Sequence, residues 1–486
     1  MPVVVVLIPF LATGAVLASW RRPNLREAWT LLAAVGSVAA NASMLPRVLE
    51  GQTPEAHLFE LVPGVDLALR ADAAGMLFAL SASVLWLLAS VYSIGYVRST
   101  KEHHQTRYFA SFAICVAATL ALAFSANLFT FFIFYERLTL ATPPFGVHGR
   151  SPVAVAAGRR YLRYLLGGGT ALLLAVGTVQ ALAPGNDFTA GGYLDGTMSR
   201  AGLIAVAVLA VLGFGTKAAV MPFHKWLPSA MVAPTPVSAL LHTVAVVKAG
   251  VFGFVRVFGF VIGPETLADI GMAALVATLA AITIVVASVI ALRQDNLKRR
   301  LAYSTIAHLS YIVLGVSLLA PDAWYGGLLH IANHALLKIT LFFCVGAIYV
   351  ATGVDKVSDM NGIGRRMPLT MAAWGIASLG LAGVPPVGGF VSKWFLGLGA
   401  IDAGQPVLAA VVLGSGLLTA GYLLPVFPRA FFRPSERFTT YGEAPLAMVV
   451  PLLLTALLAL SLGIGDFFSV GKLAASVSEA VKGVAP

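Results

Sequence analysis

The sequence has few charged residues and almost no cysteine. Only 11% of its 486 residues are Asp, Glu, Lys or Arg, and only two are cysteine. A soluble domain usually carries about 25% charged residues, so an ordinary water-soluble enzyme and a disordered chain are both excluded. Cys115 and Cys344 stand alone in apolar stretches, which excludes a disulfide framework, a zinc ribbon and an iron–sulfur ligand set.

Nucleotide-binding motifs are also missing. No GxGxxG segment follows an expected strand, and no GxxxxGK[ST] segment occurs. These glycine-rich loops hold the phosphates of dinucleotides and ATP, so we expect no cofactor bound by this chain. The net charge of +11 could indicate a nucleic-acid partner. In a lipid-embedded protein, however, such an excess lies in loops and sets orientation, and we expect no nucleic acid.

Long apolar runs are what the sequence does contain. Apolar residues make up 58% of the chain, and a helix needs about 20 of them to cross a bilayer. This rule predicts an all-α polytopic membrane protein that forms a single membrane domain. The fourteen expected spans lie near residues 2–19, 28–46, 72–97, 108–124, 127–146, 161–184, 201–221, 234–262, 266–292, 301–320, 323–352, 369–400, 407–428 and 444–466.

The Lys and Arg residues of the loops are distributed unevenly between the two sides of the membrane. Twenty Lys and Arg fall in loops on one side, and four fall on the other: Arg70, Arg200, Lys472 and Lys482. Because basic loops stay in the cytoplasm, both termini are expected on the non-cytoplasmic side. The richness in Ala, Gly and Val indicates a bacterium, so the expected location is the bacterial inner (plasma) membrane.

Several charged residues remain inside the predicted spans, where a charge costs about 2.5–3.5 kcal/mol or more. The deep acid is Glu136, and the lysines are Lys217, Lys248, Lys338 and Lys393. One acid cannot pair with four lysines, so a set of helix-locking ion pairs is the weaker interpretation. Since burial favours the neutral amine, such lysines can take up and release protons. We therefore expect a proton relay.

Arginines near the span ends need a different interpretation. Arg47, Arg163 and Arg256 lie close enough to the ends to reach the headgroups, and they are expected to be anchors. Arg137 directly follows Glu136 and points about 100° away from it on a helix, so it is expected to contact lipid or another subunit.

Histidines extend the pattern of buried charges. His330, His334 and Lys338 recur every four residues, which places them on one helix face over about 12 Å. Histidine titrates near neutral pH, so this face suits proton transfer. Zinc is the competing interpretation of two histidines four residues apart, but no buried Cys or acid lies near them, and we expect no metal.

Further polar residues are expected to support the relay. His242 precedes Lys248 by six residues in the same span, and His308 follows Ser304 by one helical turn. A purely structural role for His308 is equally compatible with the sequence.

Two predicted spans are interrupted beside a buried lysine. The seventh reads GFGTKAAVMPFHKWLP around Lys217, and the twelfth reads LAGVPPVGGFVSKWF before Lys393. Proline removes a backbone donor, which lipid tolerates only where protein or water satisfies the backbone. The residues of these breaks expected to support the site are Pro222, His224, Lys225, Pro385 and Pro386.

Paired breaks of this kind are typical of inverted-repeat transporters. Spans four to eight and nine to thirteen form two units, the second inverted because five helices are an odd number. The expected parts are residues 1–107 with three spans, 108–262 with the first repeat, 266–428 with the inverted repeat, and 444–486 with the last span and tail.

Four segments together resemble one known family. They are FYERLTL around Glu136, GTKAAVMPFHKWLPSAMVAPTPVSALLHTVAVVKAG at 215–250, LLHIANHALLKITLFF at 328–343 and PPVGGFVSKWF at 385–395. They are similar to the antiporter-like subunits, which include the proton-pumping membrane subunits of respiratory complex I. The same family includes the large subunits of Mrp-type cation/proton antiporters and relatives in membrane-bound hydrogenases.

The resemblance implies roles for the residues identified above by the free-energy cost of placing their charges in a membrane span. Glu136 corresponds to the family's fifth-span glutamate, and Lys217 to the lysine that pairs with it. Lys248 matches the eighth-span relay position, and Lys393 the terminal residue. The eleventh-span cluster, with Lys338 as its central lysine, corresponds to His330, His334 and Lys338. The partners implied are other membrane subunits, the surrounding bilayer, and a peripheral redox or carbon-uptake module as a further one.

The function expected is therefore proton translocation by one subunit of a multisubunit complex. The chain has no redox centre of its own, so a partner or an ion gradient must drive it. The alternatives are a component of an Mrp-type Na⁺/H⁺ antiporter, a transporter of a small solute, and a membrane scaffold of an inorganic-carbon uptake or hydrogenase complex. A scaffold has no need of four buried lysines, and a solute carrier needs a substrate cavity.

Overall fold

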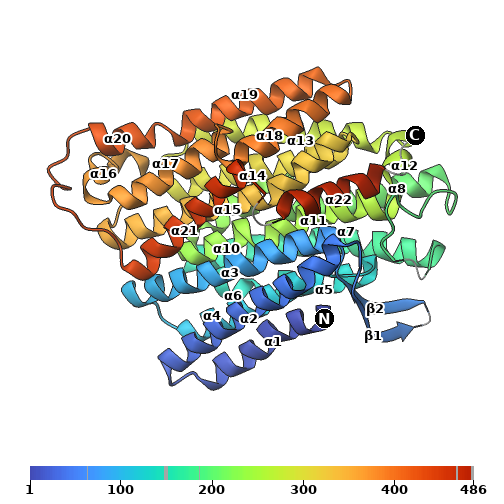
Figure 1. Cartoon of the computed structure of the whole chain (residues 1–486), viewed down its shortest axis with the longest axis horizontal. Coiled ribbons are helices and arrows are strands. Elements are labelled where there is room, and N and C mark those ends of the chain that lie inside the picture. Colours follow the sequence, from blue (N-terminus) through green and yellow to red (C-terminus); the bar gives the residue numbers. More distant parts are fainter. Residues whose placement is uncertain (63, 147–150, 185–186, 467–468, 483–486) are drawn as a thin grey trace.

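The computed structural model describes residues 1–62, 64–146, 151–184, 187–466 and 469–482. Within these ranges the chain folds almost entirely into helices that lie side by side along one common direction (Figure 1). Ten helical segments are long and apolar enough to cross a membrane, judged by length and composition. The apolar runs therefore correctly predict a mostly helical, multi-pass membrane protein.

The first third of the chain forms an outer layer and the start of the core. Its elements are α1 (Pro2–Ala18), α2 (Pro23–Leu49), β1 (Glu55–Val62), β2 (Val65–Arg70), α3 (Ala73–Ser99), α4 (Gln105–Ala123), α5 (Leu128–Ala141), α6 (Pro143–Gly146) and α7 (Pro152–Leu182).

The middle third contains the first interrupted segment. Its elements are α8 (Arg200–Lys217), a 3₁₀ turn (Phe223–Lys225), α9 (Trp226–Ser229), a second 3₁₀ turn (Ala230–Val232), α10 (Thr235–Thr243), α11 (Val246–Val257), a π-type turn (Phe258–Ile262), α12 (Pro264–Asp269), α13 (Met272–Leu292) and α14 (Leu297–Ser317).

The last third begins with the longest helix. Its elements are α15 (Pro321–Thr352), a 3₁₀ turn (Val357–Asp359), α16 (Ile363–Arg366), α17 (Pro368–Ala382), α18 (Gly388–Asp402), α19 (Pro406–Leu423), α20 (Val426–Phe432), α21 (Leu446–Ile464) and α22 (Val470–Lys482). Residues 467–468 and 483–486 of the expected tail lie outside the described residues.

Several helices begin at a short polar residue that accepts a hydrogen bond from the backbone three residues on. Such caps satisfy one of the donors left free at a helix N-terminus. The capping residues are Asp72, Asn127, Ser151, Ser199 and Asn296. These residues fix where the spans start in an otherwise apolar sequence.

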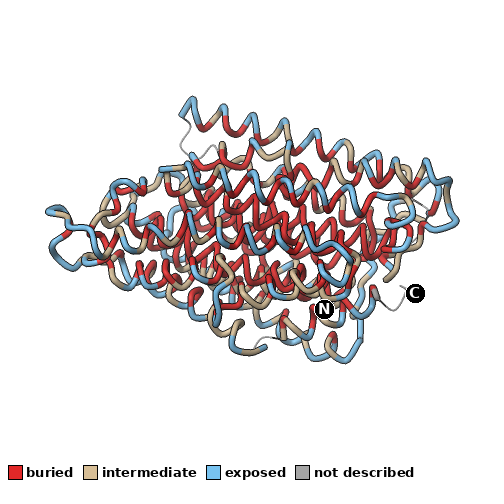
Figure 2. Tube along the Cα trace, turned by 90° about the horizontal axis from the view of Figure 1, so that it is seen from above, coloured by how far each residue is buried: buried red, intermediate tan, exposed pale blue. Residues whose placement is uncertain are grey.

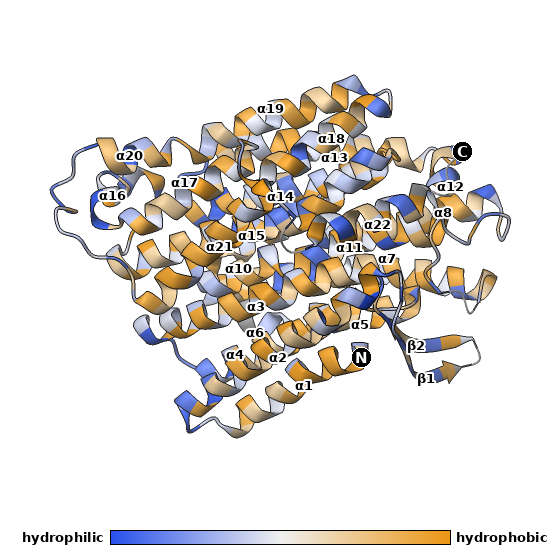
Figure 3. Ribbon diagram, viewed as in Figure 1, coloured by the Kyte–Doolittle hydropathy of each residue, from blue (hydrophilic) through white to orange (hydrophobic). Residues whose placement is uncertain are grey.

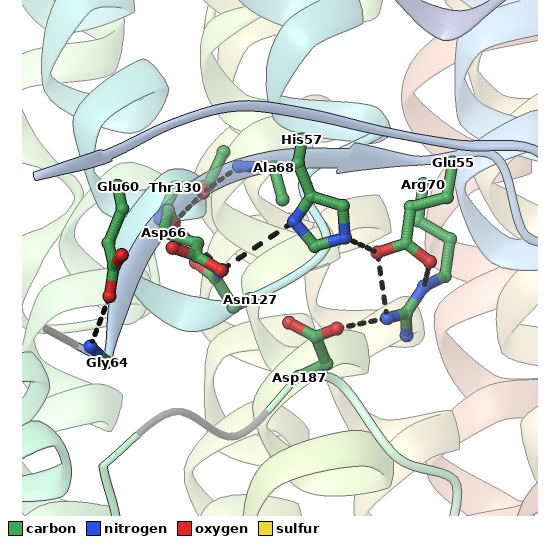
Figure 4. Close-up of polar contacts among 10 residues, drawn as sticks. All are labelled: Glu55, His57, Glu60, Gly64, Asp66, Ala68, Arg70, Asn127, Thr130 and Asp187. Atoms are coloured by element: carbon green, nitrogen blue, oxygen red, sulfur yellow. Dashed lines mark hydrogen bonds and ion pairs between the residues drawn. The ribbon is translucent and has the colours of Figure 1, made fainter.

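A two-stranded antiparallel hairpin, β1–β2, projects at one end of the molecule, toward which the N-terminus and α22 also lie (Figure 1). Arg70 bonds Glu55 at 3.2 Å and also pairs with Asp187. The two ring nitrogens of His57 face the carboxylates of Glu55 and Asp66, at 3.1 and 3.6 Å (Figure 4). These contacts fix the hairpin against the loop before α8.

The most buried residues follow the centre of the helix array (Figure 2). In the segment Thr235–Ile262 the most apolar stretch of 18 residues is completely buried. In α15, 78% of the corresponding stretch is buried. Outer helices instead expose large apolar side chains, such as Leu413 and Leu417 of α19, with fractional exposures of 70% and 77%. In Figure 3 apolar residues likewise cover most of the helix lengths, as expected where lipid is the solvent.

The structure adds a detail to one expectation from the sequence and corrects another. The eighth span is present as the apolar segment Thr235–Ile262, but it is interrupted where α10 ends at Thr243 and α11 begins at Val246, so a further break separates His242 from Lys248. Arg256 is not an anchor at the headgroups. It is 1% exposed and its guanidinium bonds the carboxylate of Asp72 at 2.8 Å.

Candidate functional site

The first group of buried polar residues lies where α8 meets α5. Lys217 is the last residue of α8 and is completely buried. Its Nζ donates to the backbone oxygen of Tyr135 at 2.6 Å and lies 3.3 Å from the centre of the Tyr135 ring. Glu136 is the next residue on α5, but among the described residues no ion pair within 4.0 Å joins it to Lys217.

The carboxylate of Glu136 lies against α7. A Cβ atom added at Gly169 would collide with the Glu136 carboxyl group, so the absence of a side chain there creates the space that the carboxylate occupies. No hydrogen-bond partner is found for its Oε1 in the described part of the chain. Arg137 is exposed and lies 5.7 Å from the ring centre of Phe10, away from the core.

Aromatic donors stabilise the end of α8. A helix C-terminus leaves its last carbonyl groups without intrahelical partners. Here the hydroxyl of Tyr135 donates to the oxygen of Gly213 at 2.9 Å, and Nε1 of Trp226 donates to the oxygen of Thr216 at 2.8 Å. Lys217 can therefore stand at a broken helix in an apolar interior without leaving that backbone unsatisfied.

Lys248 connects two helices at the centre of the molecule. It lies in the first turn of α11 and is 1% exposed. Its Nζ donates to the backbone oxygen of Ile331 on α15 at 2.9 Å. Two residues further on, Gly250 packs against the backbone at Lys217 and Ala218, so α11 contacts both the first group and α15.

Three imidazole rings gather beside Lys248. Nδ1 of His308 lies 3.2 Å from Nε2 of His330, whose Nδ1 lies 2.8 Å from the hydroxyl of Ser392. The ring centres of His334 and His308 are 5.6 Å apart. All three rings are completely buried. The i, i+4 spacing on α15 correctly predicts one shared face for His330 and His334.

Lys338 continues this face of α15. Its Nζ donates to the hydroxyl of Ser304 on α14 at 2.6 Å. The same hydroxyl accepts a hydrogen bond from Tyr422 of α19 at 2.9 Å. Lys338 thus contacts a hydroxyl rather than a carboxylate.

Lys393 lies at the second broken helix. Its Nζ donates to the backbone oxygen of Leu381, near the end of α17, at 2.6 Å. The same Nζ lies 5.0 Å from the ring centre of Tyr311. A cavity of about 230 Å³ reaches it between α18 and α19. Trp394 also lines this cavity and is 55% exposed, so Lys393 lies close to the outer surface.

The prolines of the two breaks lie apart from this line. Pro385 and Pro386 are exposed in the break between α17 and α18, and Pro222 is exposed in the break after α8. His242 is completely buried, its ring 5.0 Å from that of Phe342, and neither ring nitrogen has a partner in the described ranges.

His224 and Lys225 line a larger cavity of about 890 Å³. Lys298 and Glu102 lie in its wall, and Nζ of Lys298 donates to the oxygen of Ala233 at 2.9 Å. Burial raises the pKa of the Glu102 carboxyl group above its ordinary value. This polar cavity reaches from the basic loops toward the segment that follows Lys217.

Sequence reasoning did not find several of the residues that hold these groups. Tyr135, Tyr311, Ser392 and Tyr422 contact the titratable residues but carry no charge, so no cost of burial marks them. Gly169 has no side chain, and only the carboxyl group of Glu136 that packs against it in the folded chain shows its role. The signal that could have found Tyr422 is a polar face on an otherwise apolar helix.

The described residues do not bring together three or more His, Cys, Asp or Glu side chains that could hold a metal ion. The arrangement contains groups that can exchange protons. His308, His330 and Ser392 are in hydrogen-bond contact, and Lys338 is joined to the hydroxyls of Ser304 and Tyr422.

Comparison with known proteins gives an independent line of information. The family described as NADH:quinone oxidoreductase/Mrp antiporter, transmembrane, matches residues 125–419. Subunit N of the NADH-quinone oxidoreductase of Desulforudis audaxviator is 34% identical over 491 residues, which cover 96% of this chain and 95% of that protein. A component of a probable K⁺/H⁺ antiporter of Rhizobium meliloti is 31% identical over 488 residues, covering 95% of this chain and 46% of that protein.

Among solved structures, a chain of the Mrp complex from Dietzia sp. DQ12-45-1b superimposes with a TM-score of 0.85 at 23% identity. The match covers 98% of this chain and 96% of that chain, and it shows a shared fold. All three similar proteins are parts of multisubunit assemblies.

Proposed function

This chain belongs to the NADH:quinone oxidoreductase/Mrp antiporter transmembrane family, and we propose that it translocates protons as one subunit of a multisubunit membrane complex. The observation that carries the proposal is the line of buried titratable groups across the centre of the fold. Lys217, Lys248, Lys338 and Lys393 are each at most 7% exposed. Burying four amines in such surroundings is costly. We therefore infer that the amines have a function.

The contacts support one order of steps. Lys248 reaches α15 through Ile331, next to His330 in sequence. The imidazoles of His330, His334 and His308 lie within 5.4–5.9 Å of one another, ring centre to ring centre. A proton accepted at Lys248 would pass to Lys338, and these rings would carry it on toward Lys393, which follows the His330 partner Ser392 in sequence.

Water completes the relay in this proposal. Both ring nitrogens of His334, Nε2 of His308 and both nitrogens of His242 have no partner in the described part of the chain. Buried polar atoms in proteins are almost always hydrogen-bonded, if not by protein then by ordered water. Several such atoms in one region support a hydrated path rather than isolated water sites.

Glu136 and Lys217 would act as the switch of the relay. A carboxylate close to an amine favours its charged form, so the ammonium of Lys217 is favoured when Glu136 approaches and disfavoured when they separate. Lys217 lies at the end of α8, which is followed by short turns rather than a continuous helix. A small change in that segment would therefore change the charge state of Lys217.

Protons would be taken up from the basic face and released near Lys393. The cavity of about 890 Å³ connects that face with the segment after Lys217. The cavity of about 230 Å³ beside Lys393 provides a route outward. With basic loops in the cytoplasm, both termini would face the opposite side of a bacterial inner membrane.

We further propose the finer organisation expected from the sequence. Fourteen spans result if α1, α5, α14 and the interrupted pair α17–α18 are counted with the ten long segments. Residues 108–262 and 266–428 would form the two inverted units, each with a break next to a buried lysine. The breaks after Lys217 and before Lys393 support this pairing.

A role in a cation/proton antiporter is the second candidate, favoured by the similarity to the K⁺/H⁺ antiporter protein of Rhizobium meliloti. Alkali cations prefer oxygen ligands, whereas Glu136 is the deep carboxylate of this line. Any cation path would therefore lie in a partner chain.

Proton flux in liposomes tests the proposal. The complete complex, purified through a tag on this chain, is compared with the complex that carries Lys338→Ala and with a control that carries Lys472→Ala, an exposed lysine on α22. We expect Lys338→Ala to lower the flux about 10²-fold, the lower end for loss of a proton-transfer group, and the control to leave it unchanged. Equal flux in all three would exclude the relay.

A further inference from the structure

Helix α19 has a polar face that its apolar composition conceals. Ser415, Thr419 and Tyr422 are spaced i, i+4 and i+7 and are each at most 2% exposed, so they share one side of the helix. The opposite side exposes Leu413 and Leu417. A helix that faces lipid gains nothing from buried hydroxyls unless they find partners.

One end of this face contacts the central lysine. The hydroxyl of Tyr422 donates to Ser304 at 2.9 Å, and Ser304 accepts from Nζ of Lys338 at 2.6 Å. The hydroxyl of Thr419 lies 3.1 Å from that of Tyr422. Four polar groups from three helices therefore form one hydrogen-bonded series.

The other end contacts the terminal lysine. The hydroxyl of Ser415 is hydrogen-bonded to the hydroxyl of Tyr311 on α14, and Nζ of Lys393 lies over the Tyr311 ring. A Cβ added at Gly416 would be 3.7 Å from Nζ of Lys393. Gly416 and Tyr422 are six residues apart, about 9 Å along the helix axis, so α19 spans the interval between the two lysines.

We propose that these α19 hydroxyls form a second proton route between Lys338 and Lys393, parallel to the imidazoles of α15. The inference rests on the proposed proton translocation, and it assigns to α19 a part in the reaction. In this route Ser304, Tyr422 and Thr419 carry the proton away from Lys338, and Ser415 and Tyr311 deliver it toward Lys393.

Each step conserves protons. The Tyr422 hydroxyl, which donates to Ser304 at rest, first turns to donate to Thr419, so that Ser304 donates to Tyr422. The ammonium of Lys338 then gives one proton to the oxygen of Ser304, Ser304 gives its own proton to Tyr422, and Tyr422 gives its proton to Thr419. Every hydroxyl gains one proton and loses one, so none of them keeps a charge. The hydroxyls of Thr419 and Ser415 are one helical turn apart, a distance that one water bridges. A second water joins Tyr311 to the neutral amine of Lys393, which ends as an ammonium.

A structural role explains only part of this face. Thr419 and Ser415 also bond backbone oxygens within α19, at 2.8 and 3.3 Å, as buried Thr and Ser commonly do in helices. Tyr422 has no such backbone bond among the described residues, and its partner Ser304 is 118 residues away.

The test compares single and combined variants of the complete complex in liposomes. Tyr422→Phe removes one hydroxyl and keeps the ring. The double variant His330→Leu/His334→Leu removes the imidazole route, and a triple variant combines all three changes. Tyr441→Phe, at an exposed tyrosine in the loop before α21, is the matched control. Thermal melting of each complex checks that it is folded.

Two parallel routes predict additive losses. Tyr422→Phe should lower proton flux about two- to threefold with an unchanged melting temperature. The double histidine variant should keep a residual flux, and adding Tyr422→Phe should abolish it. The second route is wrong if Tyr422→Phe has no effect in either background, or if the folded histidine variant carries no flux at all. Should the histidine variant not fold, the effect of Tyr422→Phe alone decides. Unchanged flux in Lys338→Ala would instead refute the proposed function itself.

Discussion

The carboxylate of Glu136 on α5 lies against the backbone of Gly169 on α7, in space that any side chain at Gly169 would fill. The space that this carboxylate occupies thus depends on a residue without a side chain. Neighbouring Gly167 has no atom within 4 Å of the place where its Cβ would be. Two glycines in one helix therefore offer a matched comparison.

Gly169→Ala should lower proton flux about tenfold or more, because a displacement of a catalytic group by about 1 Å can cost as much as 10²-fold. Gly167→Ala should leave flux unchanged and slightly raise thermal stability, since Ala is favoured over Gly in a helix by about 1 kcal/mol. Flux and melting temperature of the two complexes are measured side by side. Equal flux in both would mean that the position of Glu136 is unimportant.

Glu136→Gln keeps the shape of the side chain and removes its charge. Without the carboxylate the ammonium of Lys217 loses its stabilising neighbour, so we expect flux to fall at least about tenfold, as for loss of a general acid–base group. Arg137→Gln is the control, because Arg137 is exposed and contacts Phe10 instead. A larger loss in Arg137→Gln than in Glu136→Gln would reverse the assignment.

Arg256→Met should destabilise the fold rather than block transport specifically. Removing one partner of a buried ion pair costs about 3–5 kcal/mol, and the Asp72 carboxylate would be left without the guanidinium. Asp72→Asn should cost less, because Asn still caps α3. Melting temperatures of the solubilised complexes, with the exposed Arg163→Met as control, test this order.

Lys248→Met should interrupt the line between α11 and α15. We expect flux to fall about 10²-fold, as for loss of other proton-transfer groups, while the complex keeps its melting temperature. Lys472→Met, at an exposed lysine of α22, should have little effect. Retained flux in Lys248→Met would place the uptake of protons elsewhere.

The sequence reveals the charged members of the site because each one breaks an apolar run. Lys217, Lys248, Lys338 and Lys393 are all buried, as their cost in lipid predicts. The same reasoning misjudged Arg256, since a position near a span end does not show which partner the folded chain brings to it. Asp72 is 184 residues away, and no local pattern connects the two.

Neutral members of the site escape sequence reasoning for a physical reason. Hydroxyls such as Ser304 and Tyr422 cost little in a helix, so they do not stand out in an apolar sequence. Their importance comes from distances between α14, α15 and α19, which only the folded chain sets. The break between His242 and Lys248 was missed because that segment contains neither proline nor glycine between the two residues.

The bond from Lys248 to the oxygen of Ile331 has a consequence for directionality. A charged amine and a neutral one both have an N–H to donate, so the bond can persist while the charge alternates. Such a side chain keeps its position while it binds and releases a proton. It therefore transfers protons equally well in both directions. A preferred direction of proton transport must then arise at the ends of the line, where the distance between Glu136 and Lys217 can increase.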